Sequence, residues 1–322
     1  MIKSAHNQRG MTLIELLVAM AIGSFLMIGT VQVYNQSREA FVVNESIARV
    51  QETAQFAIDT IEFDLRMASN YGRNSRGLAV EGRSLPGDAD PNNLDAPANC
   101  GARWALDLGR PVEGENNTYT LACGATGGAQ PNSDNVTVRR ATVQPTVLDK
   151  DRLQIQSTRI QGEIFQDDNV PTAFNAATSA THDLIVNTYY VAADSELIPG
   201  VPTLRRKSLG VQGGNPAIID EEVAPGVENL QIQLGVDVDG DNSVDRYVNP
   251  DDVIITPGNP AFIPAARIIT ARLWLVVRSI DPEVTLTDTQ DYEPGDVDLG
   301  VPADQFRRMQ VSKTILLRNT RT

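Results

Sequence analysis

Residues 9–33 read RGMTLIELLVAMAIGSFLMIGTVQV, and this stretch decides the architecture of the chain. After its first two residues it carries one charged side chain, Glu15, in a run of about 23 apolar or small residues. As a helix this run spans roughly 35 Å, enough to cross the hydrocarbon core of a bilayer. A short basic stretch, residues 1–10, precedes it. Because positive charges favour the cytoplasmic side, we expect residues 1–10 in the cytoplasm and the rest of the chain beyond the membrane.

Three interpretations of this stretch compete. A secretory signal peptide would be cut at Ala19-Met20-Ala21, but the apolar run continues past that motif and Glu15 interrupts it. An ordinary signal anchor fits the length but leaves a carboxylate in the membrane, at a cost on the order of 3 kcal/mol. The third interpretation accounts for the glutamate: Gly10-Met11-Thr12-Leu13-Ile14-Glu15 resembles the class III signal of type IV prepilins and pseudopilins.

This resemblance implies a role for each end of the motif. In that family a prepilin peptidase cuts after the glycine and methylates the new N-terminal amine. Residues 1–10 would then be the leader peptide, Gly10 the residue before the cut and Met11 the methylated N-terminus. Glu15 would meet the N-terminus of a neighbouring subunit during assembly. Major pilins usually carry phenylalanine where this chain has Met11.

Composition excludes several classes of function. The chain has 322 residues and a formal net charge of −14, which argues against nucleic acids and anionic lipids as main partners. It has two histidines, His6 in the leader and His182, which we expect in a loop before a strand. A Ser-His-Asp arrangement or a zinc site is therefore close to excluded, and nothing in the sequence makes a positive case for an enzyme.

Two cysteines are present, Cys100 and Cys123. On the exported side of a membrane the default for a pair is one disulfide, and two free thiols are the alternative.

Helical periodicity continues beyond the apolar stretch. Apolar residues recur at steps of three or four, and proline is absent from 11–85. They are Val43, Ile47, Val50, Ala54, Ile58, Ile61, Leu65 and Ala68. Charged residues, among them Asp59, Glu62 and Asp64, fill the flanking positions. We expect one helix from about 12 to 69, with an apolar half (11–33) and an amphipathic half (34–70). Phe56, Phe63 and Met67 widen the stripe, which favours docking on a sheet over a free coiled coil.

Residues 71–322 are predicted to form a β-rich head, which gives an α+β fold. Short strand candidates occur at 77–81, 104–108 and 118–122. Clearer strands alternate apolar and polar residues, as half-buried antiparallel strands do. They are 135–142, 153–158, 184–192, 203–209, 229–236, 268–279 and 310–318. The connections 159–181, 247–264 and 281–307 are long and acidic and are expected to be surface loops.

A narrower resemblance rests on segments that follow one another through most of the chain. They are Asp64–Ala68 with Tyr71-Gly72, Asn135–Ala141, Tyr189–Ala193, Leu204–Lys207, Val223–Gln233, Arg272–Ser279 and Thr314–Asn319. Together they resemble the PilW family of minor pilins and the related J-type pseudopilins of type II secretion. Arg73 departs from this pattern, because many relatives are expected to carry a cysteine there.

The resemblance implies a type IV pilin-like fold and a structural function. Such subunits join other minor pilins, prime pilus assembly in the inner membrane, and then sit at or near the fibre tip. The implied partners are other minor pilins, the major pilin, the prepilin peptidase, the inner-membrane assembly platform and a tip adhesin. The implied location is the bacterial inner membrane, with a periplasmic head, and then the cell surface. No cofactor is required.

One acidic loop suggests a metal. Oxygen-bearing side chains at alternate positions match the start of an EF-hand calcium loop. They are Asp237, Asp239, Asp241, Ser243 and Asp245. The sixth position is Asn242 instead of glycine, and Val248 stands where a bidentate glutamate would close the shell. A plain β-hairpin with aspartates in its turn explains the same pattern, so a structural Ca²⁺ and a metal-free hairpin both stay open.

Other functions remain as alternatives. The first is a J-type pseudopilin, which gene neighbours would distinguish. The second is a secreted hydrolase released by ordinary signal cleavage, whose N-terminus would follow Ala21. The third is an exported calcium-dependent binding module, whose ligand the long loops would recognise.

Overall fold

The computed structural model describes residues 10–84 and 94–321. The leader predicted for residues 1–10 therefore lies outside the described residues, except for Gly10. The elements are α1 (Leu13–Met67), η1 (Gly77–Ala79), β1 (Val80–Glu81), β2 (Val112–Glu115), β3 (Asn135–Ala141), β4 (Gln154–Ser157), β5 (Gly162–Phe165), β6 (Ala180–Ala192), β7 (Thr203–Gln212), β8 (Asn215–Pro225), β9 (Val227–Asp237), β10 (Arg246–Val248), β11 (Arg267–Arg278), β12 (Arg308–Leu316) and η2 (Asn319–Arg321).

The long helix predicted from the apolar and amphipathic periodicity is confirmed. It ends where Ser69 (φ 63°) and Gly72 (φ 80°) take left-handed backbone conformations, which an α-helix cannot continue. The chain divides into two compact units, Met1–Ala48 and Arg49–Thr322. The domain boundaries predicted at 33/34 and 70/71 stay a prediction.

Within the second unit, one face of α1 is buried. Its apolar residues join a core with side chains from β2, β3, β6, β9 and β11, among others. The buried helix residues are Val50, Ala54, Ala57, Ile58, Ile61, Leu65 and Ala68. Docking of the amphipathic half on a sheet is therefore confirmed, but the predicted widening of the stripe is wrong. Phe56 and Phe63 are about half exposed, and the Arg140 guanidinium lies 5.1 Å from the Phe63 ring centroid, so that ring lies beside a cation at the edge of the core.

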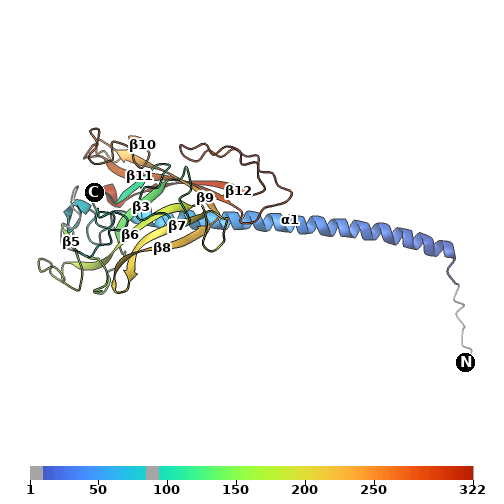
Figure 1. The fold of residues 1–322 in the computed structure, drawn as a ribbon, viewed down its shortest axis with the longest axis horizontal. Coiled ribbons are helices and arrows are strands. Elements are labelled where there is room, and N and C mark those ends of the chain that lie inside the picture. Colours follow the sequence, from blue (N-terminus) through green and yellow to red (C-terminus); the bar gives the residue numbers. More distant parts are fainter. Residues whose placement is uncertain (1–9, 85–93, 322) are drawn as a thin grey trace, which may run out of the picture. The chain divides into compact units, whose positions relative to one another are not determined.

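The strands form two sheets, which Figure 1 shows beside the last turns of α1. The larger sheet has the order β1-β5-β4-β6-β3-β2, with β7 paired to β6 and β8 paired to β7. The smaller sheet has the order β10-β9-β11-β12 and is antiparallel throughout. Among the strands of the described residues, only the short pair β1–β5 is parallel. The α+β prediction, a long N-terminal helix with an antiparallel head, is confirmed.

All seven of the clearer predicted strands are present as β3, β4, β6, β7, β9, β11 and β12, with shifts of up to four residues at their ends. Two of the short candidates are wrong. Residues 104–108 and 118–122 form turns or irregular backbone, and Trp104, Leu106 and Leu108 are buried there without forming a strand. His182 is not in a loop: it lies in β6, 3% exposed, with Nδ1 2.8 Å from the carbonyl oxygen of Thr142.

Three strands were not predicted: β2, β5 and β8. The longest of them, β8, carries Asp220-Glu221-Glu222 in its middle and so lacks the usual alternation of apolar and polar residues. It follows β7 through a tight hairpin whose central residues, Gly213 and Gly214, both have positive φ (63° and 82°). That geometry is typical of the type I′ turn, which suits the twist of the flanking strands.

Candidate functional site

The segment predicted to carry assembly, Gly10 to Glu15, forms the start of α1. Gly10, Met11 and Thr12 precede the helix, and all three are exposed. The backbone N–H and the hydroxyl of Thr12 each donate a hydrogen bond to Oε2 of Glu15, both at 3.0 Å. The Glu15 N–H in turn donates to the Thr12 hydroxyl at 3.4 Å. This reciprocal pair is a capping box, which satisfies backbone donors at the helix start.

The capping box changes how Glu15 is understood. Its carboxylate is hydrogen-bonded within its own helix, so it does not lie unsatisfied in the apolar run. The hydrogen bonds that described residues donate to Glu15 all reach Oε2. Oε1 receives no hydrogen bond from the residues that the structure describes.

The apolar half of α1 presents its side chains outward. One helix of the described chain is long and apolar enough to cross a membrane, judged by length and composition: the best window has a mean hydropathy of 2.1, and none of it is buried. Side chains such as Leu13, Phe25 and Met27 are each at least 70% exposed.

A buried carboxylate joins α1 to the larger sheet. Asp64 is 2% exposed, although the periodicity placed it among the polar flanking positions of the helix. Its Oδ1 accepts from Nε of Arg140 at 2.8 Å, and its Oδ2 accepts from Nδ2 of Asn187 at 2.6 Å and from the hydroxyl of Tyr189 at 2.7 Å. A buried charge is tolerated where it is paired and hydrogen-bonded in this way. The sequence did not predict that Asp64 is buried. The available signal was its position three residues after Ile61, which places it on the same face of the helix.

A second charged group lies on β7 and β8, where a basic strand meets an acidic one. The register places Arg205 opposite Glu222, Arg206 opposite Glu221 and Lys207 opposite Asp220. We call these six residues the charge ladder. Its inner part is largely buried: Arg205 is 1% exposed and Lys207 is 3% exposed.

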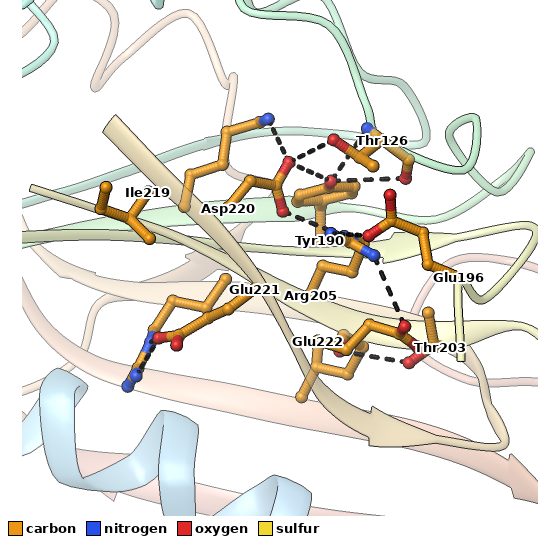
Figure 2. Close-up of polar contacts among 12 residues, drawn as sticks. Thr126, Tyr190, Glu196, Thr203, Arg205, Ile219, Asp220, Glu221 and Glu222 are labelled. Carbon is orange, nitrogen blue, oxygen red and sulfur yellow. Dashed lines mark hydrogen bonds and ion pairs between the residues drawn. The ribbon is translucent and has the colours of Figure 1, made fainter. Parts of the chain in front are cut away.

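Asp220 is the centre of the charge ladder, as Figure 2 shows. It accepts from Arg205 at 2.9 Å and from Lys207 at 2.6 Å. The hydroxyls of Tyr190 and Thr126 also donate to it, at 2.9 and 2.7 Å. Burial alone would raise the pKa of Asp220, but these four hydrogen bonds outweigh burial and hold the pKa below its ordinary value. The arrangement holds these charges in place by ion pairs and hydrogen bonds.

Two family models match the chain. Residues 188–319 match Type IV Pilus-assembly protein W, and residues 5–31 match the prokaryotic N-terminal methylation motif. Residues 188–319 therefore resemble the PilW family. The PilW match includes the whole charge ladder together with β9, β11 and β12. The methylation motif includes Gly10, Met11 and Glu15, so the resemblance drawn from the sequence is confirmed and supports a minor-pilin role.

Comparison with other proteins adds a distant likeness. A type IV-like pilin from Thermus thermophilus is 13% identical and aligns over 62% of this chain and 83% of its own, with a TM-score of 0.28. No curated protein sequence matches.

The chain has one disulfide among its described residues, and it joins Cys100 to Cys123. This pairing was inferred from the cysteine count, and the structure has the bond. Cys100 packs in a second core with Tyr71, Trp104 and Leu153, apart from the core under α1. The bond closes a segment with little regular structure, where a covalent link restricts the chain most.

The acidic loop is a hairpin turn between β9 and β10. Asp237 is fully buried: its oxygens accept from the N–H groups of Gly240 and Asn242, and Arg267 pairs with it at 3.1 Å. Ligand atoms of Asp237, Asp239 and Asp245 lie within 4.8 Å of one another. Asp241 is not part of that group: it accepts from the Ser243 N–H at 2.7 Å. The hairpin is therefore present, and calcium at this loop stays a prediction.

Proposed function

We propose that this chain is a minor pilin subunit that primes type IV pilus assembly in the inner membrane and then sits with other minor pilins at or near the tip. The observation that carries the proposal is the state of Glu15: a carboxylate placed in a membrane-length apolar helix, five residues after Gly10, with Oε2 capping its own helix and Oε1 without a hydrogen bond from the described residues. A prepilin peptidase would cut after Gly10 and leave methylated Met11 two residues before the start of α1.

The physical steps follow from the cost of a carboxylate in lipid. Glu15 at membrane depth costs on the order of 3 kcal/mol, and the Thr12 hydrogen bonds offset part of that cost. An incoming N-terminal ammonium would offset more, because opposite charges attract strongly where water is excluded. Glu15 would thus draw neighbouring subunits into one register in the inner membrane, with the head on the periplasmic side.

The head supports the same function through its rigidity. Asp64 and the buried face of α1 tie residues 50–68 to both sheets, and the charge ladder and the disulfide stabilise the rest of the head. Its partners would be other minor pilins, the major pilin, the assembly platform and a tip adhesin. A structural role of this kind requires no cofactor and no catalysis.

Replacement of Glu15 tests the proposal. In Glu15→Ala the chain should insert into the inner membrane at wild-type levels but fall at least about tenfold in the sheared pilus fraction, since this side chain is proposed to carry the pairing energy. Glu39→Ala, on the same helix but beyond the apolar half, is the matched control and should leave both amounts unchanged. Normal incorporation of Glu15→Ala would contradict the proposal, and reduced pilus number with normal secretion would separate it from the J-type pseudopilin alternative.

A further inference from the structure

Four polar segments meet at one place in the head, far apart in sequence. They are residues 115–118 after β2, 132–134 before β3, 249–251 after β10, and 295–296 in the connection between β11 and β12. Asn117, in a left-handed conformation (φ 55°), links two of the others: its N–H donates to Asp134 at 2.8 Å and its Nδ2 lies 3.4 Å from Asp296 Oδ2.

The carboxylates at this place have neutral hydrogen-bond donors. Oδ2 of Asp296 accepts from the side-chain amides of Asn116, Asn117 and Asn249, at 3.2, 3.4 and 2.7 Å. Asp134 is 1% exposed and accepts from the N–H groups of Asn117 and Ile232, both at 2.8 Å. Amides hydrogen-bond a carboxylate but do not neutralise its charge.

A third carboxylate, that of Asp251, affects Asp134 electrostatically. Burial, together with the charges of Asp296 and Asp251, raises the pKa of Asp134 to about 7 in spite of its two backbone hydrogen bonds. The charged form of Asp134 is therefore disfavoured by its surroundings, and a cation bound beside Asp296 would favour it.

Two side-chain oxygens at this place have no donor. Gln231 on β9 is 1% exposed: its Nε2 donates to Asn117 Oδ1, Asn132 O and Asn229 Oδ1, but its Oε1 receives no hydrogen bond from any described residue. A Cβ built on Gly295 would lie 3.7 Å from this oxygen, so it faces the backbone next to Asp296. The buried Oδ1 of Asn116 is likewise without a donor in the described chain. Leaving such an acceptor unsatisfied in a dry interior costs about 1–3 kcal/mol.

We propose that this place is a binding site for a divalent cation of the calcium class, with oxygens of Asp296, Asn116 and Gln231 as ligands and Asp251 supplying further negative charge. A bound water could satisfy the two amide oxygens, but it would leave the charge of Asp296 uncompensated, because the donors to Asp296 are neutral amides. The ligand set is carboxylate and amide oxygen without imidazole or thiolate, which is typical of Ca²⁺. Amide ligands on separate loops suit its flexible geometry better than the strict octahedron of Mg²⁺.

The site is separate from the predicted calcium loop. Gln231 precedes Asp237 by six residues on β9, about 20 Å along an extended strand. A cation at Asp296 would join the connection between β11 and β12 to the turn after β2 and to β9. It would thereby fix the conformation of the long acidic loop 281–307.

Calcium titration of the full-length protein in detergent, after treatment with a chelator, tests the site. Calorimetry with CaCl₂ up to about 10 mM covers the range of extracellular calcium sites. The wild type should bind, Asp296→Ala should bind at least tenfold more weakly, and Gln231→Leu, which removes one ligand oxygen without touching a carboxylate, should weaken binding by about tenfold or more. Melting curves in chelator check that each variant is folded.

Two matched controls remove acidic groups elsewhere. Asp298→Ala removes a carboxylate two residues away in an exposed acidic group with Asp291 and Glu293, and Asp239→Ala removes one from the hairpin turn. Both should keep the binding that depends on Asp296. Absence of calcium binding by the wild type would overturn the proposal. So would binding that Asp298→Ala or Asp239→Ala abolishes while Asp296→Ala and Gln231→Leu retain it.

Discussion

The hydroxyl of Tyr189 on β6 donates a hydrogen bond of 2.7 Å to the carboxylate of Asp64 on α1. This contact joins residues 125 positions apart in the sequence, in a region where both side chains are buried. Arg140 and Asn187 complete the shell around the carboxylate. The part of α1 that belongs to the second unit is thus held to the larger sheet by a specific polar contact as well as by apolar packing.

Asp64→Ala should therefore destabilise the head strongly. The substitution leaves the Arg140 guanidinium buried without its partner, and breaking a buried pair in this way costs about 3–5 kcal/mol. Denaturant unfolding of the purified full-length chain measures the change. Asp59→Ala, five residues earlier on α1, is the control: its side chain is 52% exposed and pairs with Lys313, so the loss should stay below about 1 kcal/mol. Equal losses in the two variants would contradict the anchoring role.

Asp220 should make the stability of the head depend on acid pH. Its folded pKa lies below its ordinary value, so the unfolded chain binds a proton first, near pH 4. The stabilisation from Asp220 is fully present above that pH and is lost as pH falls through the folded pKa. Asp220→Asn should cost about 3 kcal/mol at pH 7, and wild type and variant should converge as the pH falls through the folded pKa of Asp220. A difference that stays the same from pH 7 down to the acid limit of the folded state would show that ionisation of Asp220 is not its source.

The Cys100–Cys123 disulfide should add about 3 kcal/mol to the free energy of unfolding, the size expected from closing a loop of its 23-residue separation. Thermal melting of the wild type with and without a reductant measures this. The paired substitution Cys100→Ser with Cys123→Ser should melt like the reduced wild type and should not respond to reductant. A wild type that is indifferent to reduction would contradict the stabilising role of the bond.

The β7–β8 turn should tolerate asparagine but not valine at Gly213. Nothing lies within 4 Å of a Cβ built there, so the cost of a substitution is backbone strain alone. At φ 63° a branched residue should cost about 1–2 kcal/mol, whereas asparagine adopts this conformation readily. Comparison of Gly213→Val with Gly213→Asn by denaturant unfolding isolates the effect. Equal stability of the two variants would mean that the turn is not held in the left-handed conformation.

The helix and most of the sheet could be predicted because their patterns are local. The run of apolar residues and the stripe ending at Ala68 have helical spacing, and β3 alternates polar and apolar residues from Asn135 to Arg139. β8 could not be predicted in this way, because its acidic residues are matched only by the basic residues of β7. The Gly213-Gly214 pair between a basic and an acidic run was the local signal for that hairpin.

The residues of the candidate site also divide into those that a local sequence pattern predicts and those that only the fold brings together. Gly10, Met11 and Glu15 follow from the sequence, and the capping box could also have been read from Thr12 and Glu15, which have the T-x-x-E spacing. Asp64 was placed on the wrong face because a charged residue in a helix is usually exposed. The cluster at Asp296 combines four segments whose asparagines and aspartates read individually as turn residues, so only the fold brings them together.

The central claim is that residues 1–10 are removed as a leader and that Glu15 then acts in subunit assembly. Mass spectrometry of the N-terminal peptide, from the chain recovered in sheared pili, tests it most directly. The account predicts a chain that begins at N-methylated Met11. A chain that begins after Ala21, or that keeps residues 1–10, would contradict it.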